Sequence, residues 1–267
     1  FLKDNALTIS QHQILKDYCD SIGITYLCTP FSWAAALELE PLDLPAYKIG
    51  SGEMTDLPYL DKMATLNKPL IVSTGMSTED EISRTYNFLS NKNVPLVLMN
   101  CTSEYPPVYE DINLGFITEM QSIFEKAVIG HSDHTPDLFT CFGAVAYGAK
   151  VIEKHVIIDK KTPGPDQSVS IDFYQLAELV EGIRKIETAQ GSSKNVHDKE
   201  EQIREWATRS LVSTRLIKKG EVISNDMIWS KRPGTGIPSH NFWEVVGQKS
   251  LCDIPQNTLL NWDMIAK

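Results

Sequence analysis

Two histidine-containing motifs each follow directly after a short apolar run. His131, Ser132, Asp133 and His134 lie in GHSDHT, and His155 closes EKH. If both runs are neighbouring parallel strands, the imidazoles of His134 and His155 can share one divalent metal and leave positions for substrate or water. Asp133 could be a further ligand or a hydrogen-bond partner of one. A single histidine is more often a hydrogen-bonded structural residue, but two at successive strand ends favour a metal site.

A second group of polar residues suits an anion. In KIGSGE, Lys48 and Ser51 offer donors, the glycines let the backbone approach a ligand, and Glu53 supplies a carboxylate. SGE or STG alone is a weak signal, because serine and glycine also occupy plain turns. Their recurrence after several strands predicts a site for phosphate or carboxylate; the later members are Ser73, Thr74, Asn100, Thr102, Ser103 and Tyr105.

Two further segments carry side chains of uncertain role. Asp166, in PGPD, follows His155 closely enough to reach the same mouth, although a plain loop is a serious alternative. Arg232, in KRPG, is either an ordinary surface charge or a planar donor for the acyl and hydroxyl oxygens of a sugar.

The elements that must position these residues alternate between strand and helix. Near-continuous apolar strands separated by amphipathic helices call for a parallel sheet with polar residues at its carboxyl end, as in a (β/α)₈ TIM barrel. Eight strands are needed and six are visible, so we expect the first two strand-helix units to be absent from the chain. The expected strands are 24–30, 46–52, 69–75, 95–103, 127–135 and 150–156.

Capping patterns place the helices between the strands. Ser10 with Gln13 predicts the start of the first helix, which Gly23 should end. Further helices are expected at 78–89, capped by Ser77 or Thr78, and at 172–189, which completes the last barrel unit.

The pattern changes after the barrel. We expect the α/β domain to occupy residues 1–190, a polar linker to follow at 191–208, and a small, mostly β module to fill 209–267. Short β-like runs at 210–214 and 251–254 indicate the module.

Composition excludes several classes of protein. With 35 acidic against 25 basic side chains, the formal charge of −10 argues against a nucleic-acid binder. Apolar runs are too short for a membrane span. The five cysteines are irregularly spaced and contain no CxxC pair, which favours a reducing, cytoplasmic location over a disulfide framework.

The ordered motifs TPFS, YKIGSGE, STGM, CTSEYP, GHSDHT, EKH, PGPD and KRPG resemble the N-acetylneuraminate (sialic acid) synthase family, including its legionaminic and pseudaminic acid synthases, over almost the whole chain. The tail resembles the antifreeze-like (SAF, β-clip) domain that follows the barrel in that family. The resemblance implies an enzyme that condenses phosphoenolpyruvate with an N-acyl amino sugar, N-acetylmannosamine or a related hexose, and releases phosphate by C–O cleavage.

Site roles follow from the resemblance residue by residue. It makes His134 and His155 ligands of a divalent metal, Mn²⁺ or Mg²⁺, and Glu53 the carboxylate beside the reacting carbons. It implies a homodimer in which the SAF domain reaches the partner's barrel. Phosphoenolpyruvate would contact Lys48, Ser51, Ser73, Ser103, Tyr105 and Ser132, and the amino sugar would contact Asp166 and Arg232.

Two alternatives remain open. One is a Schiff-base aldolase of the sialate-lyase kind, with Lys48 or Lys154 as the reactive amine. The other is a non-catalytic carbohydrate-binding protein built from the same parts. The resembling family also uses an acidic residue and a lysine from two earlier strands, which we expect to be absent from this chain, and the sequence leaves open whether the chain alone is active.

Overall fold

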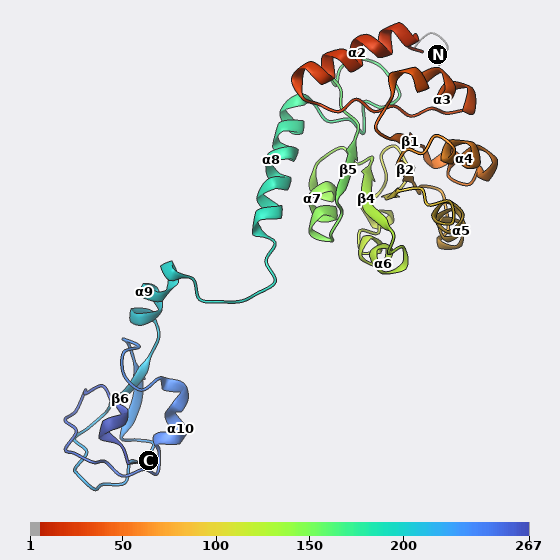
Figure 1. The fold of residues 1–267 in the computed structure, drawn as a ribbon. Helices are drawn as coiled ribbons and strands as arrows, with labels where there is room; N and C mark the ends of the chain where they lie inside the picture. Colours follow the sequence, from red (N-terminus) through yellow and green to blue (C-terminus); the bar gives the residue numbers. More distant parts are fainter. Residues whose placement is uncertain (1–5, 267) are drawn as a thin grey trace. The chain divides into compact units, whose positions relative to one another are not determined.

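The chain divides after Gly191 into two compact units (Figure 1). The computed structural model describes residues 6–266. Each unit has a buried apolar cluster of its own.

A five-stranded parallel sheet organises the first unit, and its strands follow one another in chain order. This arrangement is half of a (β/α)₈ barrel, which confirms the predicted fold class. Alignment of the strand ends is close: Cys101 lies opposite Ser132, and Asp133 lies opposite Lys154. The strands are β1 (Tyr47–Ile49), β2 (Leu70–Ser73), β3 (Leu96–Cys101), β4 (Ala127–Asp133) and β5 (Val151–Lys154).

Helices alternate with these strands and shield their apolar side chains. Leu70, Val72 and Leu98 are buried in the cluster that the helices cover. α2 and α3 precede the sheet, and each strand is followed by one of the others. The helices are α2 (Ile9–Ile22), α3 (Trp33–Leu39), α4 (Leu57–Ala64), α5 (Glu79–Ser90), α6 (Phe116–Ile123), α7 (Phe139–Ala146) and α8 (Phe173–Ala189).

Capping explains where three of the helices begin. Thr78, one of the two predicted caps, caps α5 through its side chain, and Asp172 does the same for α8. α2 differs, because its cap is Thr8 with Gln11 and not Ser10 with Gln13. The backbone of Thr8 is extended and Gln11 reaches back to it, so Ser10 already lies within the first turn.

The expected strand at 24–30 is the one strand prediction that is wrong. This segment lies beside β1 but shares a single backbone hydrogen bond with it, from the Lys48 N–H to the Cys28 carbonyl at 3.2 Å. Pro30 has no N–H to donate to a ladder. No other strand of the described residues pairs with its far edge, so the segment remains an irregular extended stretch.

The second unit is small and mostly β. β6 (Ser210–Ser213) and β7 (Ile228–Lys231) pair antiparallel, and α10 (Phe242–Val245) packs nearby. The β-like run at 251–254 forms only an isolated bridge, between Ile254 and Ile217. The stretch expected to be a linker, 191–208, contains a helix, α9 (Asp198–Ala207), which belongs to this second unit.

Within residues 6–266, none of the helices combines the length and the apolar character needed to cross a lipid bilayer.

Candidate active site

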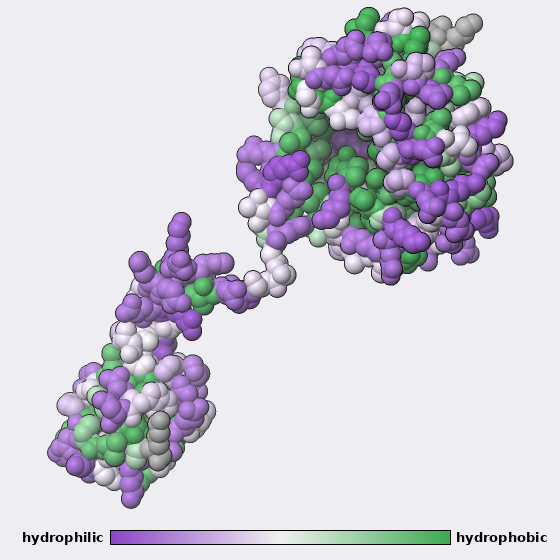
Figure 2. All heavy atoms as spheres, viewed as in Figure 1, coloured by the Kyte–Doolittle hydropathy of each residue, from purple (hydrophilic) through white to green (hydrophobic). Residues whose placement is uncertain are grey.

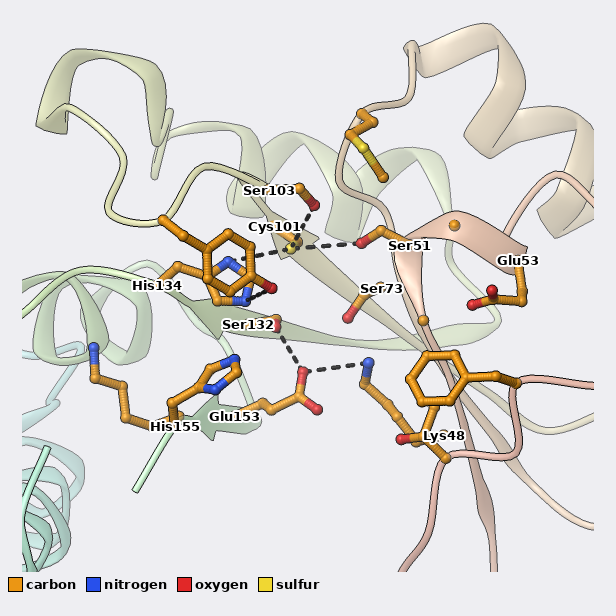
Figure 3. A pocket seen from close by; sticks show the side chains of 17 residues that line it. Lys48, Ser51, Glu53, Ser73, Cys101, Ser103, Ser132, His134, Glu153 and His155 are labelled. Carbon is orange, nitrogen blue, oxygen red and sulfur yellow. Dashed lines mark hydrogen bonds and ion pairs between the residues drawn. The ribbon is translucent and has the colours of Figure 1, made fainter. Parts of the chain in front are cut away.

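A cavity of about 620 Å³ opens at the carboxyl ends of the five parallel strands (Figure 3). Figure 2 shows the surface of this unit hollowed, with both hydrophilic and hydrophobic residues around the hollow. Most of the residues predicted for the site line this one cavity, because parallel strands bring their carboxyl ends to one edge. They are Lys48, Ser51, Glu53, Ser73, Ser103, Tyr105, Ser132, His134 and His155.

Glu153 connects two of the predicted anion donors. Its Oε2 accepts a hydrogen bond from Ser132 Oγ at 2.6 Å and lies 3.3 Å from Lys48 Nζ (Figure 3). The Lys48 side chain is largely buried, whereas the Glu153 side chain is about two-fifths exposed. The carboxylate is therefore the more exposed member of the pair, and a bound anion would compete with it for Lys48 and Ser132.

His134 presents one ring nitrogen to the cavity. Its Nδ1 lies 2.8 Å from the Thr102 carbonyl, so Nδ1 carries the proton and donates. Nε2 then accepts from the Tyr105 hydroxyl at 3.0 Å. The Tyr105 ring lies against the imidazole, with centroids 4.2 Å apart.

His155 faces the same space from the end of β5. Its ring centroid lies 5.2 Å from that of His134, and its Nδ1 lies 3.6 Å from Asp166 Oδ2. Burial and the neighbouring His134 both lower the pKa of His155. For His134, burial acts in the same direction, but contacts with Cys101 and the Thr102 carbonyl outweigh it and raise the pKa.

Two oxygen atoms at the cavity lack partners. Glu53 Oε2 and Ser73 Oγ are buried, and neither has a hydrogen bond to any described residue. Gly50 faces Glu53, and a Cβ there would lie 2.7 Å from Oε2. Buried polar atoms normally have partners, so these two indicate where a ligand binds.

Cys101 was not predicted for the site. Its Sγ lies 3.7 Å from Ser51 Oγ, 3.8 Å from Ser103 Oγ and 4.0 Å from His134 Nδ1. Burial raises the pKa of the thiol, but the hydrogen bonds from His134 and Ser51 outweigh it and lower the pKa overall. Cys101, the last residue of β3, lines the cavity between Ser51, which follows β1, and Ser103, which follows β3.

An ion pair braces the strands behind the two histidines. The Lys154 ammonium contacts Asp133 and the Thr135 carbonyl, and both charged side chains are almost fully buried. Asp133 also accepts from the Thr140 hydroxyl at 2.7 Å and lies 3.4 Å from His131 Nε2. Burial opposes ionisation of Asp133, but these partners keep its pKa below the usual range.

Thr74, Asn100 and Thr102 of the predicted anion group are not part of the cavity lining. Neither are the two residues predicted to contact the amino sugar, Asp166 and Arg232. Asp166 lies beside His155, with its Oδ2 close to the His155 Nδ1 as described above. Arg232 lies in the second unit, where its Nε donates to the Ala207 carbonyl at 2.9 Å.

Comparison with known proteins decides the family. The model of the NeuB family matches residues 1–195, and that of the SAF domain matches residues 208–266. The chain belongs to the NeuB family. Its C-terminal unit is a SAF domain.

Relatives of this NeuB-family chain include named synthases. An N,N'-diacetyllegionaminic acid synthase of Campylobacter jejuni is 36% identical, over 95% of this chain and 77% of the relative. The human N-acetylneuraminate-9-phosphate synthase is 32% identical, over 96% of this chain and 72% of the relative. A crystal structure of the N-acetylneuraminic acid synthetase of Leptospira borgpetersenii, in complex with citrate, matches with a TM-score of 0.69 at 28% identity, over 74% of this chain and 69% of that one.

The donor set of the cavity fits a divalent cation, which the resemblance implies. His134 uses Nδ1 for a carbonyl and His155 turns Nδ1 toward a carboxylate, the pattern that orients metal-binding imidazoles. Residues 6–266 contain no cluster of three or more His, Cys, Asp or Glu placed to hold a metal ion. The chain would therefore supply two ligands, and water or substrate would supply the others.

Sequence reasoning missed Glu153 and Cys101 as well as the bracing role of Lys154. Glu153 and Lys154 belong to the EKH motif, in which the sequence predicted a metal ligand at the histidine and offered Lys154 only as a Schiff-base amine. A signal was present, since two charged residues at the end of an otherwise apolar strand need buried partners. Cys101 carried no such signal, because an isolated cysteine at a strand end is usually a small apolar residue.

Proposed function

We propose that this NeuB-family chain carries the condensing site of a nonulosonic acid synthase. The reaction joins phosphoenolpyruvate to the open-chain aldehyde of an N-acyl amino sugar, N-acetylmannosamine or a related hexose, and releases inorganic phosphate. The proposal rests on one observation above all: a single cavity combines cationic and hydroxyl donors with two adjacent imidazoles and two carboxylates.

The donors suit the enol phosphate. Lys48, Ser51 and Ser73 approach from β1 and β2, and Ser103, Tyr105 and Ser132 complete the set. Binding of the anion would take Lys48 and Ser132 from Glu153 and would give Ser73 Oγ the partner that it lacks. The phosphate group of phosphoenolpyruvate loses its hydration on binding, and several convergent hydrogen-bond donors are needed to offset that loss.

The chemistry requires bonds to form and break in a defined order. The enol carbon of phosphoenolpyruvate attacks the aldehyde carbon, the C–C bond forms, and a cationic centre develops at C2 while the aldehyde oxygen takes a proton from water and becomes a hydroxyl. Water adds to the cationic centre, and Glu53 would accept the proton that this water loses. The tetrahedral intermediate then expels phosphate by cleavage of the C–O bond as its C2 hydroxyl gives up a proton to form the ketone, while Lys48 and the serine hydroxyls stabilise the departing charge.

A divalent cation, Mn²⁺ or Mg²⁺, bound by His134 and His155 would supply Lewis-acid polarisation of the aldehyde oxygen. Asp166, which lies beside His155, would contact the hydroxyl groups of the amino sugar. Arg232 would contact the same sugar from the SAF domain of the partner subunit in a homodimer. The five free cysteines agree with the cytoplasmic location that we expect.

A Schiff-base aldolase is the weaker candidate. Its nucleophile is an unprotonated lysine amine. Both candidate lysines instead have carboxylate partners, Lys48 with Glu153 and Lys154 with Asp133. Fixed ammonium groups suit anion binding better than imine formation.

The decisive experiment measures phosphate release from phosphoenolpyruvate with the whole protein, across a panel of N-acyl amino sugars and with Mn²⁺, Mg²⁺ or EDTA. We expect release that needs both an amino sugar and a divalent metal. Borohydride trapping in the presence of pyruvate should leave no covalent adduct, since an adduct would indicate the aldolase. Sugar binding without phosphate release would instead identify a non-catalytic binding protein.

A further inference from the structure

The turn that carries Arg232 is attached to the end of helix α9. The Arg232 Nε donates to the Ala207 carbonyl at 2.9 Å, and the Gly234 N–H donates to the Glu205 carbonyl at 2.7 Å. These carbonyls belong to the last turn of α9, where acceptors have no partner inside the helix. The guanidinium thus lies at the negative end of a helix dipole.

Trp206 covers one side of the same guanidinium. The central carbon of the Arg232 group lies 5.7 Å from the centre of the indole ring. Trp206 is 58% exposed, so the indole does not serve to fill the core of the SAF unit. A cation beside an indole face is attracted by the ring quadrupole.

The close approach of the turn to α9 depends on Gly234. A Cβ at this position would lie 1.8 Å from Thr208 Oγ1 and 3.2 Å from the Glu205 carbonyl oxygen. Any other residue would therefore require either the Thr208 side chain or the turn itself to shift. This requirement is a second sign that the geometry of the Arg232 turn is specified.

The two terminal nitrogens of Arg232 are left for another molecule. Within residues 6–266, neither of them has a hydrogen bond or an ion pair, although Nε is engaged. The Nε edge of the guanidinium donates to a carbonyl and one of its faces lies against an indole. The two terminal nitrogens remain available as donors.

We propose that Trp206, together with the last carbonyls of α9, positions Arg232 so that its terminal nitrogens meet the amino sugar. This inference rests on the proposed function, because Arg232 is the sugar-binding residue in it. A free arginine at the surface would lose rotamer freedom on binding. Holding its stem in the free protein reduces that loss and tightens sugar binding without any contact between Trp206 and the sugar.

The test compares variants of the whole protein in the phosphate-release assay, with KM measured separately for phosphoenolpyruvate and for the acceptor, N-acetylmannosamine in the first instance. We expect Trp206→Ala to raise the acceptor KM by about 2- to 5-fold, the range of an exposed cation–π contact. The KM for phosphoenolpyruvate should not change. Trp206→Phe should restore part of the loss, and Gly234→Ala should reproduce it.

Two controls separate positioning from general damage. Trp243→Ala, at another exposed tryptophan of the SAF unit, should leave the acceptor KM unchanged. In an Arg232→Ala background, Trp206→Ala should have no further effect, because the residue that it positions is gone. An equal effect in both backgrounds, or an equal rise in the phosphoenolpyruvate KM, would overturn the inference.

A second measurement keeps this inference distinct from the proposed function. The ¹⁵N NMR signal of the Arg232 Nε should show an ordered side chain in the unmodified protein and a mobile one in Trp206→Ala. Absence of phosphate release with every amino sugar would refute the synthase and the sugar contact. An Nε equally mobile in both proteins would refute the positioning, whatever the activity.

Discussion

Asp133 and Lys154 form a buried ion pair between β4 and β5, and each directly precedes one of the two cavity histidines. The strand register places Asp133 opposite Lys154, so the pair fixes the separation of the strand ends from which His134 and His155 project. A salt bridge in this position acts on the geometry of the imidazoles, although it touches neither of them.

Removing the ammonium should destabilise the first unit strongly. Lys154→Met would leave the Asp133 carboxylate buried without its cation, and breaking such a pair costs about 3–5 kcal/mol. Urea unfolding followed by circular dichroism measures the loss. Lys150→Met, at an exposed position just before the same strand, should change stability by less than about 0.5 kcal/mol; equal losses would show that Asp133 does not depend on the pair.

Stability should also fall at acid pH because of Asp133. Its pKa in the folded chain lies below the unfolded value, so its contribution is complete above about pH 4 and is lost as the pH falls further. In Asp133→Asn that contribution is absent at every pH. The difference in unfolding free energy between the two proteins should therefore narrow from pH 6 to pH 3, and a constant difference would contradict the assignment.

His155→Ala should remove metal-dependent turnover while it leaves the fold largely intact. The ring is about one-third exposed and packs at the cavity and not in a core cluster. We expect Mn²⁺ affinity, measured by electron paramagnetic resonance, and phosphate release each to fall by at least about 100-fold, more than the loss of an outer partner of a ligand causes. His240→Ala, in the SAF unit, is the control, and unchanged Mn²⁺ binding in His155→Ala would rule out the ligand role.

Glu153→Gln should strengthen the binding of phosphoenolpyruvate. The carboxylate competes for Lys48 and Ser132, whereas a neutral amide leaves the lysine charge available to the ligand. Calorimetric titration should show a dissociation constant about 2- to 5-fold lower, as expected for one partly exposed charge pair. Glu125→Gln, on an exposed turn, should have no effect. Weaker binding in Glu153→Gln would mean that this carboxylate orders the two donors for the ligand.

Much of the fold and of the cavity is predictable from the sequence, for one physical reason. Side chains that end parallel strands must share an edge, so the sequence alone groups residues as distant in the chain as Ser51, Ser132 and His155. The apolar pattern of a segment does not show whether a neighbouring strand is there to pair with it. For that reason the expected strand at 24–30 is wrong.

Contacts across the cavity could not be predicted from the sequence. Glu153 pairs with Lys48 of a strand that is not adjacent to its own, and no spacing encodes such a pairing. The same holds for Arg232, because the indole of Trp206 and the helix end that surround it come from a stretch whose composition indicated a linker.

The unpartnered oxygens of Ser73 and Glu53 should lower the thermal stability of the protein, although the proposed reaction needs them. An enclosed oxygen without a partner destabilises a folded chain by about 1–3 kcal/mol, so Ser73→Ala would give a sturdier protein in the absence of substrate. That gain would be lost wherever the reaction needs the hydroxyl. Selection for thermal stability alone would therefore favour loss of this hydroxyl.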